Sequence, residues 1–476
     1  MILWDSYIVI PGFNYYCFFG FHPLRGYFIS NGHLHLLVKN NNISAWGNFP
    51  RIIGKISKAS TREQLIKTLN ENDTIIPFGN GRSYGDSALN DHMVQYDNPE
   101  IPIEFDQELG IVQVSAATQI GDLIDYILPF GWFPPVVPGT KFVTIGGAIA
   151  ADIHGKNHHV DGCFSQHIIS IDLMLQNGDI VQCSHQENSD LFKATCGGMG
   201  LTGVILNATI KMIQVQSRFI EQISYKAQNI DELFSHFHRY DSKRYSVAWL
   251  DCTAKGNKLG RGVLITGEFL KNGVLSGYNT DNHSRLNIPF FLPSWLINHL
   301  TLKIFNTLYY HLSGFDEPKK VVVDLNRFFF PLDQILNWNR LYGKSGFLQY
   351  QFVLPLKKSK EGMEKILNII SESGQGSPLA VLKLFGPRNK NYLSFPMEGF
   401  TLALDFKNQP ALFPLLDELD KIVLEYEGRV YLAKDARIKE ENFESGYAKI
   451  KEFRRLRHQD NLEIKFQSHQ SRRLGL

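Results

Sequence analysis

The residues whose types and spacing could do chemistry begin with a glycine-rich stretch, Pro77 to Ser87 (PFGNGRSYGDS). Three glycines in seven residues permit positive φ angles and let successive backbone N–H groups point at one anion. A pyrophosphate would fit such a loop, although the same residues can equally form a simple turn. The stretch lacks the third, helix-opening glycine and the later acid of the Rossmann fingerprint, so it predicts a different kind of anion site.

Two more clusters of small residues follow. One spans Pro138 to Asn157, and the other, Gly197 to Gly203, precedes a predicted strand over residues 204–213. Small residues throughout the first of these indicate that a flat or extended object approaches the backbone closely. Tight packing of a helix on a sheet is the alternative explanation.

Histidines and one lysine are the candidates for proton transfer. His154, His158 and His159 suggest a metal site, but Gly155 intervenes and no H-E-x-x-H arrangement is present. A single histidine beside a cofactor is the better use, because imidazole exchanges a proton near neutral pH. Lys434 is a surface residue by default, and becomes functional if the end of the chain folds back onto the first domain.

The elements that must position these residues can be predicted from their periodicity. A helix capped by Ser60 with Glu63 precedes the apolar run Thr74 to Ile76, and Thr118 is expected to cap another helix after a strand at 111–115. Asn177-Gly178 predicts a primed turn between strands at 170–175 and 180–183. Further expected elements are a short capped helix at 188–193, strands at 346–354, 381–385 and 400–406 in an antiparallel sheet, and a helix at 410–426 on that sheet.

Two stretches are harder to place. Residues 271–320 are the least regular part, which indicates a lid or a disordered segment. The basic run Arg454, Arg455 and Arg457 with His458 favours a solvated helix face over a patch that binds phosphate or lipid headgroups.

Composition sets the broad class. With 476 residues, 43% hydrophobic and 20% charged, the chain is long enough for two or three globular domains. A net charge of +2 gives no field that would favour nucleic acid, and the five scattered cysteines favour reduced thiols. The aromatic-rich first 43 residues contain no apolar run of about 18 residues and no signal-peptide pattern. A peripheral anchor, an irregular extension and an incorrect start all remain open for them.

The three glycine clusters, in this order, resemble the vanillyl-alcohol-oxidase, or PCMH-type, family of FAD-linked oxidases. Longer strings at 79–86, 152–159, 383–387 and 431–435 resemble the branch of that family that oxidises a polyprenyl-phosphoryl ribose. The similarity runs from about Trp46 to the C-terminus. It implies an α+β fold in which a two-part FAD-binding domain carries an inserted substrate domain built on an antiparallel sheet.

The domain boundaries expected from the resemblance are an extension of unknown role (1–43), the first part of the FAD domain (44–218), the substrate domain (219–428) and the C-terminal part of the FAD domain (429–476). FAD is expected to be non-covalent, because Arg82 stands where many relatives carry the tethering histidine. The resemblance implies the following cofactor-binding residues: Pro77, Phe78, Gly79, Asn80, Gly81, Arg82, Ser83, Tyr84, Gly85, Asp86, Ser87, Gly139, Thr144, Ile145, Gly146, Gly147, Ala151, Asp152, Ile153, His154, Val204, Ile205, Tyr431 and Lys434.

His154, Lys434 and Tyr84 are the catalytic residues that the resemblance implies. Lys434 would be a fixed cation at the pyrimidine end of the flavin, and His154 or Lys434 would take the hydroxyl proton. The implied substrate residues are Trp249, Gln349, Gln351, Lys383 and Thr401. Gln349 and Gln351 are two apart on a strand and so face one side, and Lys383 could meet a phosphate. Ala403 stands where some members carry a cysteine, so thiol-directed inhibition is not expected.

The expected function is therefore FAD-dependent oxidation of the 2-hydroxyl of a polyprenyl-phosphoryl-β-D-ribose to the 2-keto sugar. This is the first half of a 2′-epimerisation that serves arabinose-donor and cell-envelope synthesis. A separate NAD(P)H-dependent short-chain reductase and a peripheral membrane contact are the expected partners, with no metal and no nucleic acid. The expected location is the cytoplasm or the surface of the inner membrane.

Two other functions remain as alternatives. One is a sugar-lactone or polyol oxidase of the same fold. The other is a flavin-binding regulatory or scaffold protein without turnover, which the combination of Tyr84, His154, Lys383 and Lys434 disfavours.

Overall fold

The glycine loop at 77–87 connects two strands of a small parallel sheet in a computed structural model of the chain. The structure describes residues 42–98, 104–275, 286–313 and 318–476, and the backbone of four N-terminal strands. Those four strands form one antiparallel sheet, in the order β1 (Tyr7–Ile8), β2 (Cys17–Phe18), β3 (Gly26–Ser30) and β4 (His33–Leu37). The predictions for residues 1–43 as a whole fall largely outside the described residues.

The parallel sheet has the order β7 (Lys55–Ala59), β9 (His92–Tyr96), β8 (Ile76–Pro77). Helix α1 (Arg62–Asn70) crosses from β7 to β8 and buries Leu65 and Leu69. Its N-cap is Thr61, whose side chain accepts the N–H of Gln64. The predicted cap at Ser60 is therefore wrong by one residue. A short antiparallel pair, β5 (Asn42–Ser44) and β6 (Arg51–Ile53), precedes this sheet.

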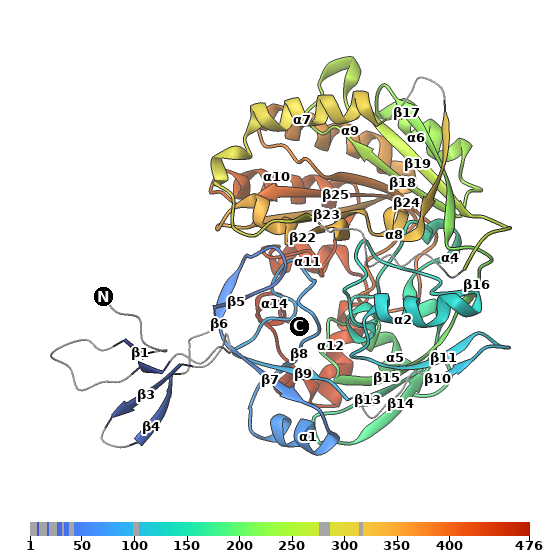
Figure 1. Ribbon diagram of the computed structural model, residues 1–476. Coiled ribbons are helices and arrows are strands. Elements are labelled where there is room, and N and C mark those ends of the chain that lie inside the picture. Colours follow the sequence, from blue (N-terminus) through green and yellow to red (C-terminus); the bar gives the residue numbers. More distant parts are fainter. Residues whose placement is uncertain are drawn as a thin grey trace.

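A second, antiparallel sheet completes the lower lobe in Figure 1. Its order is β10 (Glu104–Asp106), β11 (Ile111–Ser115), β15 (Val204–Lys211), β13 (Ile168–Met174), β14 (Ile180–Ser184). The β13–β14 hairpin is confirmed, but the predicted primed turn is wrong: Gly178 has a φ of +88°, whereas Asn177 lacks the positive φ that a primed turn requires there, and the Gly178 N–H donates to the Leu175 carbonyl. The predicted strand at 204–213 ends at Lys211, and β16 (Ile213–Gln214) leaves the sheet to pair with β12 (Trp132–Phe133).

Four short helices accompany these strands: α2 (Ile120–Ile127), α3 (Ile145–Ala150), α4 (His158–Asp161) and α5 (Ser189–Thr195). The predicted cap of α2 at Thr118 is wrong. Gln119 occupies the N-cap position without a side-chain hydrogen bond, and its backbone forms an isolated bridge with Thr144. The N-cap of α5, Asn188, likewise makes no side-chain cap and lies in the left-handed region.

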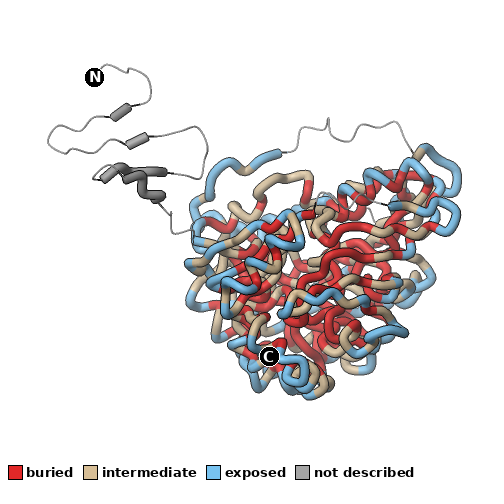
Figure 2. Tube along the Cα trace, turned by 90° about the horizontal axis from the view of Figure 1, so that it is seen from below, coloured by how far each residue is buried: buried red, intermediate tan, exposed pale blue. Residues whose placement is uncertain are grey.

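An eight-stranded antiparallel sheet forms the upper lobe in Figure 1. Its order is β21 (Lys319–Asp324), β17 (Phe219–Ala227), β19 (Gly262–Phe269), β18 (Tyr245–Leu250), β24 (Ala380–Phe385), β25 (Gly399–Lys407), β23 (Phe347–Pro355), β26 (Arg429–Val430). Helices α6 (Ile230–Arg239), α9 (Leu356–Ser373) and α10 (Leu412–Glu425) cover one face. The predicted strands at 346–354, 381–385 and 400–406 and the helix at 410–426 are confirmed. Buried residues run through both lobes, as Figure 2 shows.

The C-terminal helices return to the lower lobe. They are α11 (Glu440–Gly446), α12 (Ile450–Gln459), α13 (Leu462–Lys465) and α14 (His469–Arg473). Ile75 N–H donates to the Lys465 carbonyl over 2.8 Å, and the red C-terminal segment lies beside β8 in Figure 1. On these contacts we propose the domain division 44–218, 219–428 and 429–476, with β26 as the point of return.

Arg457 on α12 corrects the predicted solvated face. Its side chain is 1% exposed, and its guanidinium donates to the backbone carbonyls of Leu201 and Phe466. Because Leu201 belongs to the third glycine cluster and Phe466 to the C-terminal segment, this arginine joins the two parts of the lower lobe.

The predicted irregular stretch 271–320 is only partly irregular. It contains α7 (His299–Leu312), a 14-residue helix whose N-cap Asn298 forms a capping box with Thr301. It also contains β20 (Leu286–Asn287), which pairs with β22 (Ile335–Leu336), and it is followed by α8 (Leu325–Phe329). Residues 276–285 and 314–317 lie outside the described part of the chain. Among the described helices, none is both long enough and apolar enough to cross a bilayer.

Candidate active site

A cavity of about 1360 Å³ lies between the two lobes and is lined by both. The lower lobe contributes the glycine loop after β8, the segment that leads into α3, and the turn before β15. The upper lobe contributes one face of its sheet, and α7 contributes Phe305 and Tyr309. The volume exceeds the roughly 300–1,000 Å³ that is usual for a drug-sized ligand, so the cavity can hold a large cofactor together with a substrate.

The first two glycine clusters form one wall of this cavity. The side chain of Asn80 donates to the Phe142 carbonyl over 3.1 Å. A Cβ atom at Gly79 would lie 2.6 Å from the hydroxyl oxygen of Thr144, and Gly81 has a φ of +60°. The loop therefore needs glycine both for its backbone angle and for its close approach to the segment before α3.

The third cluster meets the same wall. Met199, Gly200 and Gly203 line the cavity, followed by Val204 and Ile205 of β15. Three segments that are far apart in the sequence thus converge on one space. Because these residues are small, few large side chains protrude from the wall, and a planar or extended ligand can lie against it.

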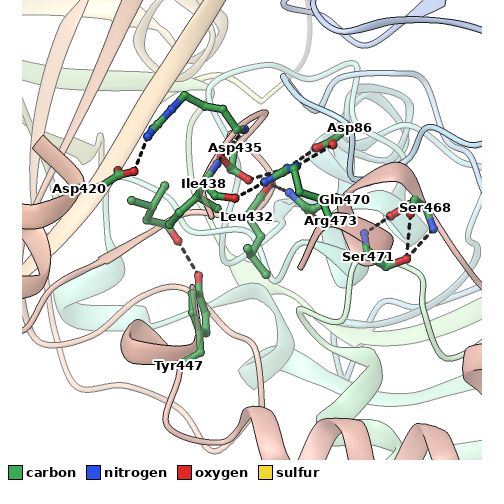
Figure 3. Close-up of polar contacts among 12 residues, drawn as sticks. Asp86, Asp420, Leu432, Asp435, Ile438, Tyr447, Ser468, Gln470, Ser471 and Arg473 are labelled. Atoms are coloured by element: carbon green, nitrogen blue, oxygen red, sulfur yellow. Dashed lines mark hydrogen bonds and ion pairs between the residues drawn. The ribbon is translucent and has the colours of Figure 1, made fainter. Parts of the chain in front are cut away.

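The C-terminal segment 431–435 is fastened to the glycine loop by the contacts drawn in Figure 3. One guanidinium, Arg473, contacts Asp86 of the loop at 2.7 Å and Asp435 at 2.9 Å, and Gln470 donates to the Leu432 carbonyl over 2.8 Å. Both carboxylates are nearly fully buried, so this arginine is their main source of neutralisation.

The same fastening places Lys434 at the cavity. The backbone N–H of Tyr84 donates to the Ala433 carbonyl over 3.0 Å. The Nζ atom of Lys434 lies 3.7 Å from the centroid of the Tyr84 ring. The end of the chain therefore folds back onto the first domain, which is the condition under which the sequence predicted a functional role for Lys434.

Strand register places the substrate-side residues on one face of the large sheet. Trp249, Val381, Ala403 and Gln351 are successive cross-strand partners in one row. Lys383 pairs with Thr401 in the row two residues along, and Gln349 pairs with Asp405 in the row on the other side of the first. Because side chains two apart on a strand share a face, all three rows point to the cavity side.

A hydrogen-bonded set of polar groups crosses this face. The amide nitrogen of Gln351 lies 3.1 Å from His154 Nε2 and 3.2 Å from the Thr401 hydroxyl. An amide nitrogen only donates, so His154 Nε2 accepts, and the neutral ring carries its proton on Nδ1. Nδ1 is buried without a partner among the described residues. Burial, followed by the nearby Lys383, holds the pKa of His154 well below its usual value, so the ring is neutral.

Three lysines surround the same space. Each is half-buried because it faces the cavity. Desolvation lowers the pKa of Lys156 to about 7 and that of Lys383 to about 8. It also lowers the pKa of Lys434 to about 7, although the negative charge of Asp405 acts to raise that pKa. Asp405 is fully buried, and desolvation raises its pKa to about 7.

Asp405 and Lys156 are site residues that sequence reasoning did not single out. The amide of Gln349 donates to Asp405 Oδ1 over 2.5 Å, whereas Oδ2 is buried without a partner among the described residues. The available signal was a carboxylate inside the otherwise apolar strand TLALDF. A charge at such a position is rarely buried unless it is paired or functional.

The donor set fits FAD. An added Cβ at Gly139 would meet no atom within 4 Å, so this glycine leaves the cavity open along the small-residue wall. The buried Arg82 Nε and His154 Nδ1 atoms lack partners within the described part of the chain, and the three lysines supply cationic charge. An anionic dinucleotide with a flat ring system would meet all of these features.

Comparison with known proteins agrees with this geometry. The family model described as "FAD binding domain" matches residues 56–184, which include the first two glycine clusters. A decaprenylphosphoryl-β-D-ribose oxidase from Mycolicibacterium smegmatis is 37% identical over 451 residues, which cover 91% of this chain and 97% of that protein. The chain belongs to the decaprenylphosphoryl-β-D-ribose oxidase family. It is an FAD-dependent oxidoreductase of the α+β, PCMH-type fold, as the resemblance implied.

More distant matches cover less of the chain. An L-gulonolactone oxidase from Mus musculus is 27% identical over 194 residues, covering 40% of this chain and 43% of that protein. A Δ(24)-sterol reductase from Homo sapiens is 32% identical over 111 residues, covering 23% of this chain and 22% of that protein. The similarity to the ribose oxidase family is therefore much more extensive.

Most of the predicted site residues lie at the cavity. Those that line it are Pro77, Phe78, Gly79, Asn80, Gly81, Arg82, Ser83, Tyr84, Ser87, Gly139, Thr144, Gly146, Gly147, Ala151, Ile153, His154, Val204, Ile205, Trp249, Gln349, Gln351, Lys383, Tyr431 and Lys434. Ala403 also lines the cavity.

Five predicted site residues lie outside the lining: Gly85, Asp86, Ile145, Asp152 and Thr401. A Cβ at Gly85 would meet the Asp435 carbonyl at 1.6 Å, and Asp86 is paired with Arg473, so both hold the C-terminal segment. Ile145 is the first residue of α3 and is fully buried in the core. Thr401 is buried behind Gln351, where its hydroxyl donates to the Phe352 carbonyl.

Asp152 is the fifth of these residues, and its role is structural. It accepts hydrogen bonds from the side chains of Asn389, Asn391 and Ser394 at 2.6 to 3.0 Å. The carboxylate thus joins the segment after α3 to the loop after β24 and does not face the cofactor space.

The neighbouring histidines have partners within the protein. His158 Nε2 lies 3.3 Å from Cys163 Sγ, and His159 Nε2 lies 2.9 Å from the Lys243 carbonyl. In the described part of the chain, no three His, Cys, Asp or Glu side chains are grouped closely enough to hold a metal ion.

Proposed function

We propose that the chain oxidises the 2-hydroxyl of a polyprenyl-phosphoryl-β-D-ribose to the 2-keto sugar, the first half of a 2′-epimerisation in arabinose-donor and cell-envelope synthesis. The observation that supports this proposal most directly is the position of the Lys383 side chain. Its ammonium lines the cavity and has no hydrogen-bond or ion-pair partner among the described residues. A lactone or a free polyol would leave that cation unmatched, whereas the phosphate of a sugar phosphate would neutralise it.

FAD, when bound, supplies the hydride acceptor, and we propose that it is bound non-covalently. Arg82 supports this, because its guanidinium stacks over Trp46 at 4.5 Å and Phe142 at 5.1 Å, and it has no nucleophilic ring nitrogen with which to form the tether. Its aromatic neighbours therefore hold the guanidinium of this loop residue in place.

Proton transfer is assigned to Lys434. With a pKa near 7, its amine is partly neutral at neutral pH and can accept the proton of the hydroxyl. Once protonated, Lys434 is an ammonium group that would stabilise negative charge on a bound flavin. His154, with its proton on Nδ1, acts as a hydrogen-bond donor that orients the sugar together with Gln351.

The remaining expectations concern partners. A 2-keto product completes the epimerisation only when a hydride returns to the opposite face, so a separate NAD(P)H-dependent short-chain reductase is part of this proposal. A peripheral contact with the surface of the inner membrane also belongs to it, because the substrate carries a polyprenyl chain.

Anaerobic flavin bleaching tests the function. The purified protein is expected to be yellow, and acid precipitation to release the FAD. A polyprenyl-phosphoryl pentose is expected to bleach the flavin, whereas an aldonolactone and xylitol are not. Bleaching by the lactone or the polyol alone would instead favour the sugar-lactone or polyol oxidase.

A further inference from the structure

Helix α7 presents an apolar face to solvent. Leu300, Ile304, Leu308 and Leu312 follow one another at four-residue spacing, and their exposed fractions are 64%, 51%, 56% and 80%. The segment before the helix adds Leu286, Phe290 and Trp295, each exposed by at least 64%. We call these seven residues the α7 surface. Single exposed leucines are ordinary, but four exposed apolar residues on one helix face, with three more just before the helix in the sequence, mark an interaction site.

The opposite face of α7 is held by polar contacts. The amide of Asn306 is fully buried and donates to Asp251 over 3.1 Å and to the Ser377 carbonyl over 3.2 Å. Arg261 donates to the Thr307 hydroxyl over 3.0 Å. The inner face also buries Leu302 and Tyr310, so α7 carries apolar side chains on both faces. Its outward face is fixed by these anchors and cannot turn inward.

The α7 surface continues into the cavity. Phe305 and Tyr309 line the cavity, yet they remain 48% and 36% exposed. The Tyr309 ring lies 4.6 Å from the ring of Trp249, a cavity residue on β18. An apolar path therefore runs from the exterior of α7 to the row of the sheet that carries Gln351.

Charge indicates the kind of partner. Between Leu286 and Ser313 the sequence has no aspartate and no glutamate, and it includes Lys303, His299 and His311. A helix with exposed leucines, flanking aromatics and basic groups without acids is typical of segments that lie in the interfacial plane of a bilayer. A protein partner would instead be expected to meet a polar rim with groups of both signs.

We propose that the α7 surface docks the chain on a lipid bilayer, with α7 in the interfacial plane, so that a polyprenyl tail passes from the bilayer to the cavity beside Phe305 and Tyr309. The entry route rests on the proposed function, because it assumes a lipid-linked substrate. The docking itself does not require turnover.

Vesicle flotation of the full chain tests the docking. The probes are vesicles of phosphatidylcholine with phosphatidylglycerol, and the test variant is Leu300→Glu with Leu308→Glu. Both positions are exposed and lie outside the cavity lining, so flavin content and melting temperature should not change. The matched control is Leu109→Glu with Ile464→Glu, since these residues are 55% and 62% exposed in the lower lobe.

Wild type and control are expected to float with the vesicles, and the test variant to lose at least about tenfold in bound fraction. Failure of wild type to float, or equal flotation of the test variant, would overturn the proposal. So would a wild-type dimer that the test variant dissociates without any effect of vesicles, because the α7 surface would then join two copies.

A second comparison separates this proposal from the proposed function. The test variant should oxidise a vesicle-embedded polyprenyl-phosphoryl pentose slowly, but oxidise a short-tailed soluble form at the wild-type rate. Flotation without flavin bleaching by either pentose would refute the proposed function and leave the docking intact. Flavin bleaching without flotation would refute the docking and leave the proposed function intact.

Discussion

The ammonium of Lys434 lies 3.7 Å from the centre of the Tyr84 ring, although one residue belongs to the C-terminal segment and the other to the first glycine loop. The contact exists because Arg473 pairs with Asp86 of the loop and with Asp435 of the segment. Tyr84 offers the face of its ring to the cation and leaves the nitrogen free of ion pairs among the described residues. Lys434 is therefore positioned without being neutralised.

Lys434→Ala should lower the rate of anaerobic flavin reduction by about 100-fold or more, because the variant loses both a proton acceptor and a cation at the reacting ring. Stopped-flow bleaching with the phosphoryl pentose measures this rate. Unchanged circular dichroism and bound FAD should accompany it. If the variant reduced its flavin at the wild-type rate, lysine would have no part in the reaction.

Asp405→Asn should shift the pH dependence of flavin reduction. The rate is expected to rise with pH as Lys434 loses its proton, with a midpoint near 7. The negative charge of Asp405 raises the pKa of Lys434, so its removal should move that midpoint to lower pH. A pH series of single-turnover rates measures the shift, and a midpoint that moved to higher pH would exclude this coupling.

The same variant carries a stability prediction. Desolvation raises the pKa of Asp405 from 3.8 to about 7, so the folded chain binds this proton more tightly than the unfolded chain does. The stabilisation of the folded chain by this bound proton is complete below pH 3.8 and is lost as the pH rises through about 7. Asp405→Asn should therefore gain stability relative to wild type between pH 5 and pH 8, as measured by thermal unfolding at both values.

Lys383→Met should weaken binding of the phosphorylated substrate. Loss of a hydrogen bond to a charged group costs about 1.5–3 kcal/mol, so KM should rise about 10- to 150-fold with kcat nearly unchanged. An analogue that lacks the phosphate should bind wild type and variant equally. The exposed Lys421 provides the control Lys421→Met. Equal loss for both substrates would assign Lys383 to the fold rather than to the phosphate.

Arg473→Ala should destabilise the chain and release FAD. Asp86 and Asp435 are 6% and 2% exposed, so the substitution leaves two buried carboxylates without their shared partner, at a cost of about 3 kcal/mol. The loss should be smaller at pH 5 than at pH 8, because desolvation raises the pKa of Asp86 and its protonation removes one of the buried charges. Chemical unfolding and the flavin remaining after gel filtration measure the two effects. Arg455→Ala, at an exposed position on α12, should change neither.

The sequence predicted the parts of the fold that local pattern determines. The alternating strands β23, β24 and β25, the Asn-Gly hairpin and helix α10 were all found where periodicity placed them. Helix caps were less predictable. Thr118 has a good capping side chain, but the neighbouring Gln119 is recruited into a bridge with Thr144, a tertiary contact that no local pattern contains.

The site was predictable where residue type alone is informative. Glycines that line the cavity were identified because only a close ligand or a special backbone angle demands them. Asp86 and Asp152 were misplaced because a carboxylate in a glycine-rich loop can equally bind a distant arginine or asparagine. Asp405 was missed because its pairing with Gln349 depends on strand register across β23 and β25, and its effect on Lys434 depends on the return of the C-terminal segment to the cavity. The apolar exterior of α7 was also hidden, since its polar anchors come from the turn after β18 and from the loop before β24.

The Arg473 contacts have a consequence for biosynthesis. Residues 56–184 leave the ribosome early. Asp435 and Arg473, which join the C-terminal segment to the glycine loop, follow only after the whole upper sheet has been translated. The glycine loop at 77–87 is therefore made before the C-terminal segment that packs against it. The complete wall of the cavity can therefore form only once the last residues of the chain have been made.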